Sequence, residues 1–163
     1  MMPDILGATH LQAYLQAHQI SGEIIFLASP TPTVETAAAA VGALPDQIVK
    51  SILFLLPEQP VLAVSCGLGR IDRRVIAAHF GVGRKRVKLA DAETVLAILG
   101  YSVGTVPPFG HRQPILTLLD QPVLAHTQVY AGGGEHNALV RLAAADILKY
   151  TQAEVLDLQY WPQ

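Results

Sequence analysis

Two strongly apolar segments separated by a four-residue turn constrain the fold more than any other feature of this sequence. Residues 51–56 and 61–66 consist almost entirely of apolar side chains, and Pro57-Glu58-Gln59-Pro60 lies between them. Apolar runs of this length, bounded by turn residues, predict two strands joined as a β-hairpin. The prolines also keep both runs too short to cross a membrane, so we expect no membrane-spanning segment.

Helix and strand patterns alternate along the rest of the chain. Three predicted helices begin at the capping residues Thr33, Asp72 and Asp91 and are followed by glycine. The predicted helices are 11–17, 33–42, 72–80, 91–99 and 143–149, with a short helical turn at 45–49. The other predicted strands are 23–27, 86–89, 115–119, 128–130, 138–142 and 154–158. With 163 residues, 51% of them hydrophobic, we expect one compact α/β (α+β) domain over residues 1–163, with helices flanking a mixed twisted sheet or partly closed barrel.

The chain contains one cysteine, Cys66, which cannot form an internal disulfide. A lone cysteine favours a reducing compartment. The start Met1-Met2-Pro3-Asp4 lacks the basic n-region of a secretory signal. We therefore expect a cytoplasmic protein.

Positive charge is concentrated in one stretch, although the net charge of the chain is −2. Seven of the eleven Lys and Arg residues fall between positions 70 and 88, where Asp72 is the single acid. We call them the basic segment: Arg70, Arg73, Arg74, Arg84, Lys85, Arg86 and Lys88. Such a cluster can bind phosphates with an affinity that falls as salt rises. A solvated helix face and turn is the alternative interpretation.

Lys50 stands directly before the apolar run 51–56. An ammonium group loses water at such a position, and its desolvation is usually compensated by an anion. Lys50 is therefore a candidate for binding a negatively charged group of a ligand. The alternative is a lysine that extends its side chain from the strand end to solvent.

The segment 103–111, Val-Gly-Thr-Val-Pro-Pro-Phe-Gly-His, is rich in glycine and proline. These residues predict a stiff loop whose backbone amides can face a ligand without an intervening side chain. An ordinary Gly/Pro connector is the alternative. His111, which ends the segment, is either a polar contact for the ligand or a surface histidine.

Other chemistries find little support in the sequence. The six histidines show no H-x-x-x-H spacing, so we expect no catalytic metal. The glycine-rich positions 67–69, 81–83 and 132–134 do not continue into phosphate-binding patterns, so we expect no nucleotide cofactor. No G-x-S-x-G elbow is present. Cys66 ends an apolar strand and is expected to pack as a small hydrophobic residue rather than to act as a nucleophile.

The order and spacing of these segments resemble the YbaK/ProX family of aminoacyl-tRNA deacylases, whose domain is also the editing insertion of bacterial prolyl-tRNA synthetases. The likeness runs from about Thr33 to Leu158. It rests on the helix 33–42, the junction 48–51, Gly104-x-x-x-Pro108 followed by Gly110, the run 115–120 and the segment 130–137.

The resemblance implies hydrolysis, in trans, of the ester of mischarged tRNA, of the type that removes Cys or Ala from the tRNA for proline. It implies substrate-assisted chemistry without a metal or cofactor, with Lys50, Gly104 and Pro108 in the catalytic positions. It extends the substrate-binding surface to Thr33, Ser51, Thr105, Val106, Pro107, Phe109, Gly110, His111, Gly132, Gly133, Gly134, His136 and Asn137.

The partner implied by the resemblance is the acceptor end of mischarged tRNA, held by the basic segment. Prolyl-tRNA synthetase is a further candidate partner, and the protein itself is expected to be a monomer or a weak homodimer. We expect Gly132-Gly133-Gly134 to form the far wall of the pocket, where absent side chains leave room for a base or ribose. Two other functions stay open: a non-catalytic module that binds the tRNA end, and a hydrolase of an unrelated small acyl ester.

Overall fold

The computed structural model describes residues 4–160, so the predicted domain bounds at 1 and 163 lie outside the described residues. Its helices are α1 (Ala8–Ala17), α2 (Val34–Val41), α3 (Arg73–Phe80), α4 (Ala92–Leu99) and α5 (Ala144–Thr151). Short 3-10 turns lie at Pro45–Gln47, Arg84–Arg86 and Gln121–Ala125. Among the helices of this range, none is long and apolar enough to cross a membrane.

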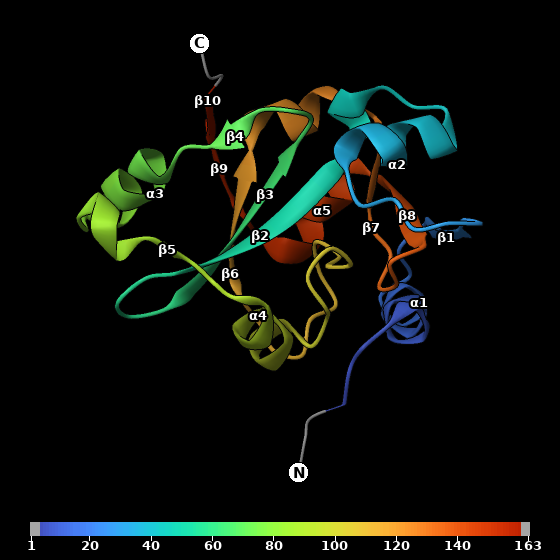
Figure 1. The fold of residues 1–163 in the computed structure, drawn as a ribbon, viewed down its shortest axis with the longest axis horizontal. Coiled ribbons are helices and arrows are strands. Elements are labelled where there is room, and N and C mark those ends of the chain that lie inside the picture. Colours follow the sequence, from blue (N-terminus) through green and yellow to red (C-terminus); the bar gives the residue numbers. More distant parts are fainter. Residues whose placement is uncertain (1–3, 161–163) are drawn as a thin grey trace.

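The strands form a large mixed sheet, a small antiparallel sheet and a short two-stranded ribbon. The large sheet has the order β5 (Lys88–Leu89), β2 (Val49–Leu55), β3 (Pro60–Cys66), β6 (Leu116–Asp120) and β9 (Glu154–Leu156). The small sheet has the order β1 (Gly22–Phe26), β8 (Ala138–Ala143) and β7 (Gln128–Gly132). The ribbon pairs β10 (Gln159–Tyr160) with β4 (Arg70–Ile71). In Figure 1, the β2–β3 hairpin runs between α3 at the left and the small sheet at the right.

The large sheet combines antiparallel and parallel pairs, as the predicted mixed sheet requires. The predicted hairpin is confirmed, since β2 and β3 pair antiparallel and Leu55 lies opposite Pro60. β6 runs parallel to β3, and β9 runs parallel to β6. A single parallel bridge between Ile48 and Tyr130 joins the two sheets. This bridge brings the middle of β7 close to the start of β2.

Local capping signals place the helices where the sequence predicts them. The Thr33 hydroxyl accepts from the backbone N–H of Thr36 at 3.1 Å, which caps α2. The carboxylates of Asp72 and Asp91 cap α3 and α4 in the same way, at 2.9 and 2.8 Å. Each of these helices ends at a glycine with a left-handed backbone. The predicted boundaries of these three helices are therefore confirmed to within one or two residues.

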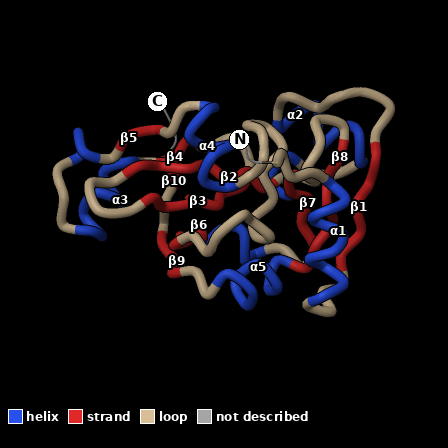
Figure 2. The backbone as a smooth tube through the Cα atoms, turned by 90° about the horizontal axis from the view of Figure 1, so that it is seen from below, coloured by secondary structure: helices blue, strands red, loops and turns tan. Residues whose placement is uncertain are grey.

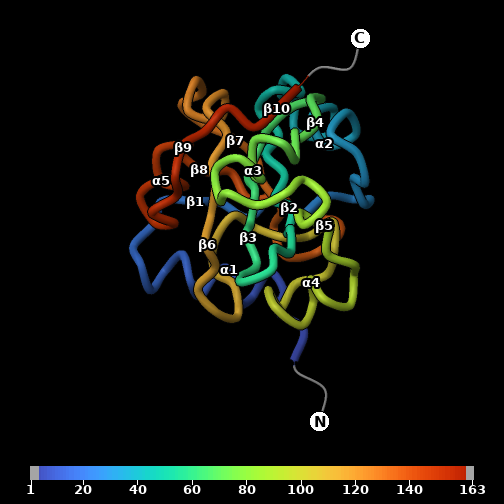
Figure 3. Tube along the Cα trace, turned by 90° about the vertical axis from the view of Figure 1, so that its left-hand side faces the viewer, coloured from blue at the N-terminus to red at the C-terminus, as the bar shows by residue number. Residues whose placement is uncertain are grey.

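Two hydrophobic cores lie on opposite faces of the large sheet. The larger one packs α1, α4 and α5 against the two sheets, and Figure 2 shows α1 beside the small sheet. The other places Ile76 and Ala77 of α3 against Phe54, Val61 and Ala63. Figure 3 shows α3 in front of the strands of the large sheet. The strands between the cores are buried on both faces, which explains their nearly continuous apolar sequence.

Several local predictions need correction. The predicted strand 86–89 is a 3-10 turn at Arg84–Arg86 followed by only two strand residues. The predicted last strand, 154–158, ends at Leu156 and is followed by the separate strand β10. α1 begins three residues before the predicted start at position 11. These errors lie where long-range pairing, rather than local sequence, decides the conformation.

Candidate functional site

A cavity of about 250 Å³ lies at the uncovered edge of β2. β5 pairs with β2 only at Phe54 and Leu55, and the bridge to β7 is made by Ile48, the residue just before β2. The stretch between these contacts has no strand along its outer edge and faces the cavity. The cavity is lined by Thr31, Pro32, Thr33, Val34, Ala37, Ile48, Val49, Lys50, Ser51, Ile52, Val103, Gly104, Val106, Gly132 and Leu139.

The structure brings together the two features singled out in the sequence. Lys50 and Gly104 are more than fifty positions apart in the chain, and both line this cavity. Thr33, Ser51, Val106 and Gly132 line it as well. Most of the remaining wall is apolar and comes from residues that the sequence marks only as core formers. That is why sequence reasoning missed them.

Lys50 is partly buried, and its Nζ donates a hydrogen bond to the carbonyl oxygen of Gly69 at 3.0 Å. Burial lowers the pKa of Lys50; the charge of Arg70 adds to this, and Cys66 and Asp120 oppose it. A partly desolvated ammonium interacts more strongly with an anion or a polarised carbonyl than one in water does. Because Lys50 lines the cavity and binds a backbone carbonyl, it does not simply extend into solvent.

Ser51 adds an unpaired polar group to the same cavity. Its hydroxyl oxygen is buried and has no hydrogen-bond partner within the described residues. A buried hydroxyl without a partner is costly, by about 1–3 kcal/mol. Its presence in the lining of the cavity is explained if a ligand supplies the missing hydrogen bond.

The first half of the glycine/proline loop forms one wall of the cavity. Gly104 has a φ of +87°, which an L side chain rarely adopts. The N–H and the hydroxyl of Thr105 both bond to the Ser102 carbonyl, at 3.0 and 2.8 Å. Pro107 and Pro108 carry no N–H. The loop can therefore offer a ligand the N–H groups of Gly104 and Val106, for which residues 4–160 supply no acceptor.

The three glycines at 132–134 have a different role from the one predicted. A Cβ on Gly132 would lie 2.4 Å from the Val106 carbonyl oxygen, and one on Gly133 would lie 2.7 Å from Ala138 backbone. A Cβ on Gly134 would lie 2.6 Å from the backbone of Gly7. All three glycines make room for the protein's own backbone. Of the three, Gly132 lines the cavity, and Gly133 and Gly134 do not.

Of the residues that follow the glycines, Glu135 and Asn137 make contacts within the fold, and His136 lies near Gly104. The Glu135 carboxylate accepts a hydrogen bond from the Ala8 N–H and so caps α1 from a distant part of the chain. The Asn137 side chain donates to the Leu27 carbonyl at 3.2 Å, a structural contact. His136 is exposed, and its ring lies 3.8 Å from the position that a Cβ on Gly104 would take. His136 thus stays a candidate at the rim of the cavity.

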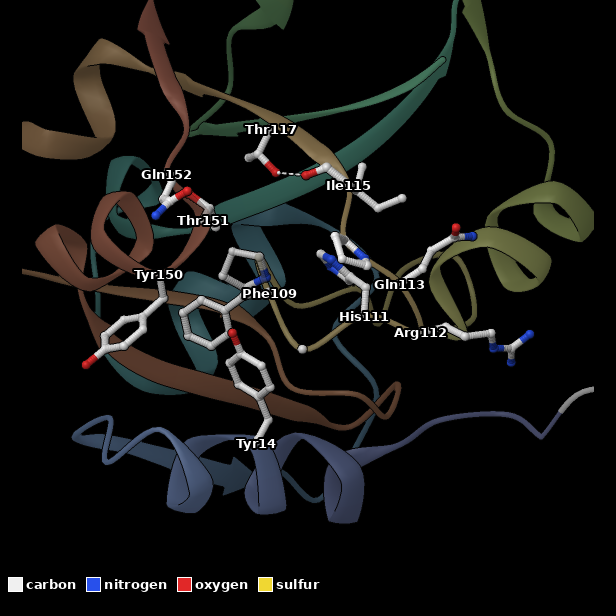
Figure 4. A pocket seen from close by; sticks show the side chains of 13 residues that line it. Tyr14, Phe109, His111, Arg112, Gln113, Ile115, Thr117, Tyr150, Thr151 and Gln152 are labelled. Atoms are coloured by element: carbon white, nitrogen blue, oxygen red, sulfur yellow. Dashed lines mark hydrogen bonds between the residues drawn. The ribbon is translucent and has the colours of Figure 1, made fainter. Parts of the chain in front are cut away.

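The second half of the glycine/proline loop lines a different cavity, of about 390 Å³ (Figure 4). Pro108, Phe109, Gly110 and His111 line this space and are absent from the lining of the Lys50 cavity. Phe109 stacks on Tyr14 of α1, with ring centroids 5.3 Å apart. The predicted site residues are therefore split between the two sides of one loop.

His111 braces the loop in the structure. Its Nε2 donates to the Pro107 carbonyl at 2.7 Å, and the Tyr101 hydroxyl donates to the Gly110 carbonyl at 2.9 Å. Burial lowers the pKa of His111 to about 4, although the Pro107 hydrogen bond acts in the opposite direction. His111 is therefore neutral near pH 7, with its proton on Nε2 and committed to the loop.

Cys66 lacks the properties of a nucleophile. Burial raises its pKa to about 12, the carboxylates of Asp120 and Asp46 add to the rise, and Lys50 opposes it. The thiol is therefore protonated near neutral pH, whereas nucleophilic cysteines react as thiolates. In the described part of the chain, no three His, Cys, Asp or Glu side chains are grouped closely enough to hold a metal ion.

The basic segment is distributed over β4, α3 and the turn that leads into β5. Arg74 forms an ion pair with Asp72 at 2.9 Å, and the Arg73 guanidinium lies 5.6 Å from the Phe54 ring centroid. These two side chains thus have partners within the protein. The exposed members of the segment are Arg70, Arg74, Arg84, Lys85, Arg86 and Lys88. The members at 84–88 lie near the C-terminal end of β2, because Lys88 pairs with Leu55. Lys50 lies near the other end of that strand.

Comparison with known proteins shows which family has this arrangement. The sequence pattern of the aminoacyl-tRNA editing domain matches residues 28–150. The chain belongs to the aminoacyl-tRNA editing domain family. The predicted resemblance to YbaK/ProX proteins and to the prolyl-tRNA synthetase editing domain is thereby confirmed.

Individual relatives agree with this assignment. The chain is 26% identical over 127 residues to a proline–tRNA ligase of Streptococcus equi subsp. equi. The aligned region covers 78% of the chain and 20% of the ligase. The chain spans only about a fifth of the length of such ligases. A crystal structure of a proposed trans-editing enzyme for prolyl tRNA synthetase has a TM-score of 0.88 and 32% identity, and covers 94% of this chain and 97% of its own. The crystal structure of the hypothetical protein APE2540 has a TM-score of 0.85 and 29% sequence identity. This match covers 93% of this chain and 99% of that protein's chain.

Proposed function

We propose that this editing-domain protein hydrolyses the ester bond of mischarged tRNA in trans, with the aminoacyl end in the Lys50 cavity. The observation that carries the proposal is the convergence of the partly desolvated Lys50, the unpaired Ser51 hydroxyl and the Gly104 loop on one cavity. Membership of the editing-domain family supports an aminoacyl-tRNA as the substrate.

The chemistry asks little of the protein, because an aminoacyl ester is already activated. The site must hold the 3′-terminal adenosine, orient a water or the substrate's own hydroxyl or thiol, and stabilise the oxyanion that develops on the carbonyl. No protein nucleophile is needed, which agrees with the protonated thiol of Cys66. When water is the nucleophile, its oxygen bonds to the carbonyl carbon, the ester C–O bond breaks and a proton of the water passes to the ribose oxygen, which gives free amino acid and tRNA.

Lys50 and the loop backbone have separate roles in this proposal. The Lys50 ammonium binds the terminal phosphate or the ester carbonyl, where its positive charge opposes the charge of the oxyanion. The N–H groups of Gly104 and Val106 receive the carbonyl oxygen, and the positive φ of Gly104 lets the substrate approach the backbone. Pro107 and Pro108, together with the His111 hydrogen bond, keep this backbone fixed.

The walls of the cavity favour a small aminoacyl side chain. Val34, Ala37, Val103, Val106 and Leu139 surround a space of about 250 Å³. Because this space must also receive the ribose end of the substrate, we propose that it takes alanyl or cysteinyl groups in preference to large aromatic ones. The related ligases and the trans-editing structure make the tRNA for proline the first candidate.

The test is single-turnover deacylation of a panel of mischarged tRNAs in the presence of EDTA. We expect release of a small amino acid such as alanine or cysteine well above the spontaneous rate, and slow release of phenylalanine. Binding without hydrolysis of any member would instead support a tRNA-end binding module. Hydrolysis of small acyl esters alone would support an unrelated esterase.

The basic segment predicts a strong salt dependence of tRNA binding. The double charge reversal Arg84→Glu with Arg86→Glu should weaken binding and reduce the slope of log affinity against log salt concentration by about 2, because two phosphate contacts are lost. Filter binding or fluorescence anisotropy at several salt concentrations measures this slope. Lys149→Glu, on the exposed face of α5, is the matched control. A slope that neither variant changes would remove the basic segment from the tRNA interface.

A further inference from the structure

A row of three polar residues crosses the large sheet beside the cavity. Lys50 on β2 pairs with Ser65 on β3. Val64 pairs with Leu119 on the parallel strand β6, so the next position in register brings Ser65 beside Asp120. Paired residues on neighbouring strands share a face of the sheet. Lys50, Ser65 and Asp120 therefore lie on the face that otherwise packs against α3, and their Cα atoms span about 10 Å, two strand spacings.

Asp120 is unusually well enclosed for a carboxylate. It is 1% exposed. One oxygen accepts from the Leu158 N–H at 2.7 Å, and the other accepts from Nε2 of Gln159. Because both oxygens act as acceptors, the arrangement is that of an ionised carboxylate. The cation in its row is Lys50, which forms no direct ion pair with Asp120 among the described residues but lies close enough for the two charges to interact.

Gln159 links Asp120 to the group that binds Lys50. The Gln159 Nε2 also donates to the Cys66 carbonyl at 2.8 Å. Its amide packs directly on Gly69, since a Cβ at that position would lie 1.8 Å from Gln159 Oε1. The Gly69 carbonyl in turn accepts from Lys50 Nζ at 3.0 Å. A continuous set of contacts thus leads from Asp120 to the Lys50 ammonium.

Several charged groups around this row act on the pKa values of Lys50 and Asp120. Burial lowers the pKa of Lys50, and Arg70 adds to this, whereas Cys66 and Asp120 oppose it. At Asp120, burial raises the pKa and Asp157 adds to the rise, whereas the hydrogen bonds from Leu158, Gln159 and Gln121 oppose it. Because the Cys66 thiol is neutral near pH 7, Asp120 is the anion left to support the Lys50 charge.

We propose that Asp120 is a positioning residue for Lys50. Its carboxylate supports the positive charge of the partly buried ammonium, and through Gln159 it packs against Gly69, whose carbonyl fixes Nζ beside the cavity. The consequence for catalysis rests on the proposed function. The effect of the Asp120 charge on Lys50 is a property of the folded protein and can be measured without any substrate.

The test measures the pKa of Lys50 by ¹³C NMR of the lysine ε-methylene groups. The chain has four lysines, and Lys50→Arg assigns the Lys50 signal. Asp120→Asn should lower the pKa of Lys50 by about one unit, the effect of losing a nearby opposite charge. Asp157→Asn removes an exposed carboxylate of the same neighbourhood and should leave the Lys50 pKa unchanged. An unchanged Lys50 pKa in folded Asp120→Asn, or an equal fall in both variants, would overturn the proposal.

A second measurement on the wild type guards against a variant that does not fold. The Lys50 ¹³Cε signal should show a second, smaller inflection at the pH where the Asp120 ¹³Cγ signal titrates, and the absence of this inflection would also overturn the proposal. If the protein deacylates tRNA, the alkaline limb of its pH–rate profile should move to lower pH in Asp120→Asn by the same amount as the Lys50 pKa. Failure on every mischarged tRNA would disprove the proposed function alone, because the NMR results stand independently of activity.

Discussion

Replacing Lys50 by alanine should slow deacylation by at least about a hundredfold. Loss of one group that stabilises an oxyanion typically costs about 3 kcal/mol of barrier, and each 1.4 kcal/mol or so is a factor of ten in rate. Single-turnover deacylation of the best substrate of the panel measures the effect. Lys50→Arg should restore only part of the rate, because a planar guanidinium does not reproduce a compact ammonium bound to the Gly69 carbonyl.

The stability of Lys50→Ala should change by no more than about 1 kcal/mol. Removing a partly buried ammonium relieves its desolvation, and the loss of its hydrogen bond to Gly69 offsets that gain. Thermal melting of both proteins checks this. Lys149→Ala, which removes an exposed lysine of α5, is the matched control and should keep full activity. Normal turnover in folded Lys50→Ala would contradict the assigned role.

Gly132→Ala should destabilise the protein and abolish most of its activity. The added Cβ would lie 2.4 Å from the Val106 carbonyl oxygen and 2.8 Å from the Thr105 carbonyl group. Backbone atoms cannot turn aside as a side chain does, so the loop must move away from β7. Overpacking of this kind costs about 1–3 kcal/mol, or roughly 3–10 °C in Tm for a chain of this size.

The measurement for Gly132→Ala combines thermal melting with single-turnover deacylation. Gly83→Ala is the matched control, because Gly83 has a φ of −70° and no atom within 4 Å of an added Cβ. That variant should melt and react like the wild type. A Gly132→Ala protein with wild-type Tm and rate would show that the loop does not rest on β7 as described.

Much of the fold could be predicted from the sequence because its signals are local. The capping residues Thr33, Asp72 and Asp91 each bond to an N–H of their own helix within three positions. The β2–β3 hairpin follows from two apolar runs and the turn between them. In both cases the residues that decide the conformation are neighbours in the chain.

The features that could not be predicted depend on contacts between distant segments. Nothing local distinguishes Glu135 as the cap of α1, or indicates that Gly132 is small because the Val106 carbonyl lies against it. β4 and β10 are two-residue strands that exist only because they pair with each other. Asp120 looks like the end of a strand until the register of three strands places it in line with Lys50.

The sequence indicates which residues could form the candidate site, but it does not indicate which way each of them faces. Lys50 and Gly104 line the same cavity. His111 and Phe109 follow Gly104 closely in sequence, but the two prolines between them turn the chain to the other side of the loop. A sequence shows that a loop is stiff without showing which cavity each of its residues faces.

The central claim is that the Lys50 cavity receives the aminoacyl end of the substrate. Its most direct test is ¹H–¹⁵N NMR titration with 3′-alanylamino-3′-deoxyadenosine, in which an amide replaces the reactive ester. We expect the largest shifts at Ser51, Gly104, Val106 and Gly132, which line that cavity. Shifts centred instead on Phe109, His111 and Tyr150, which line the cavity on the other side of the loop, would contradict the claim.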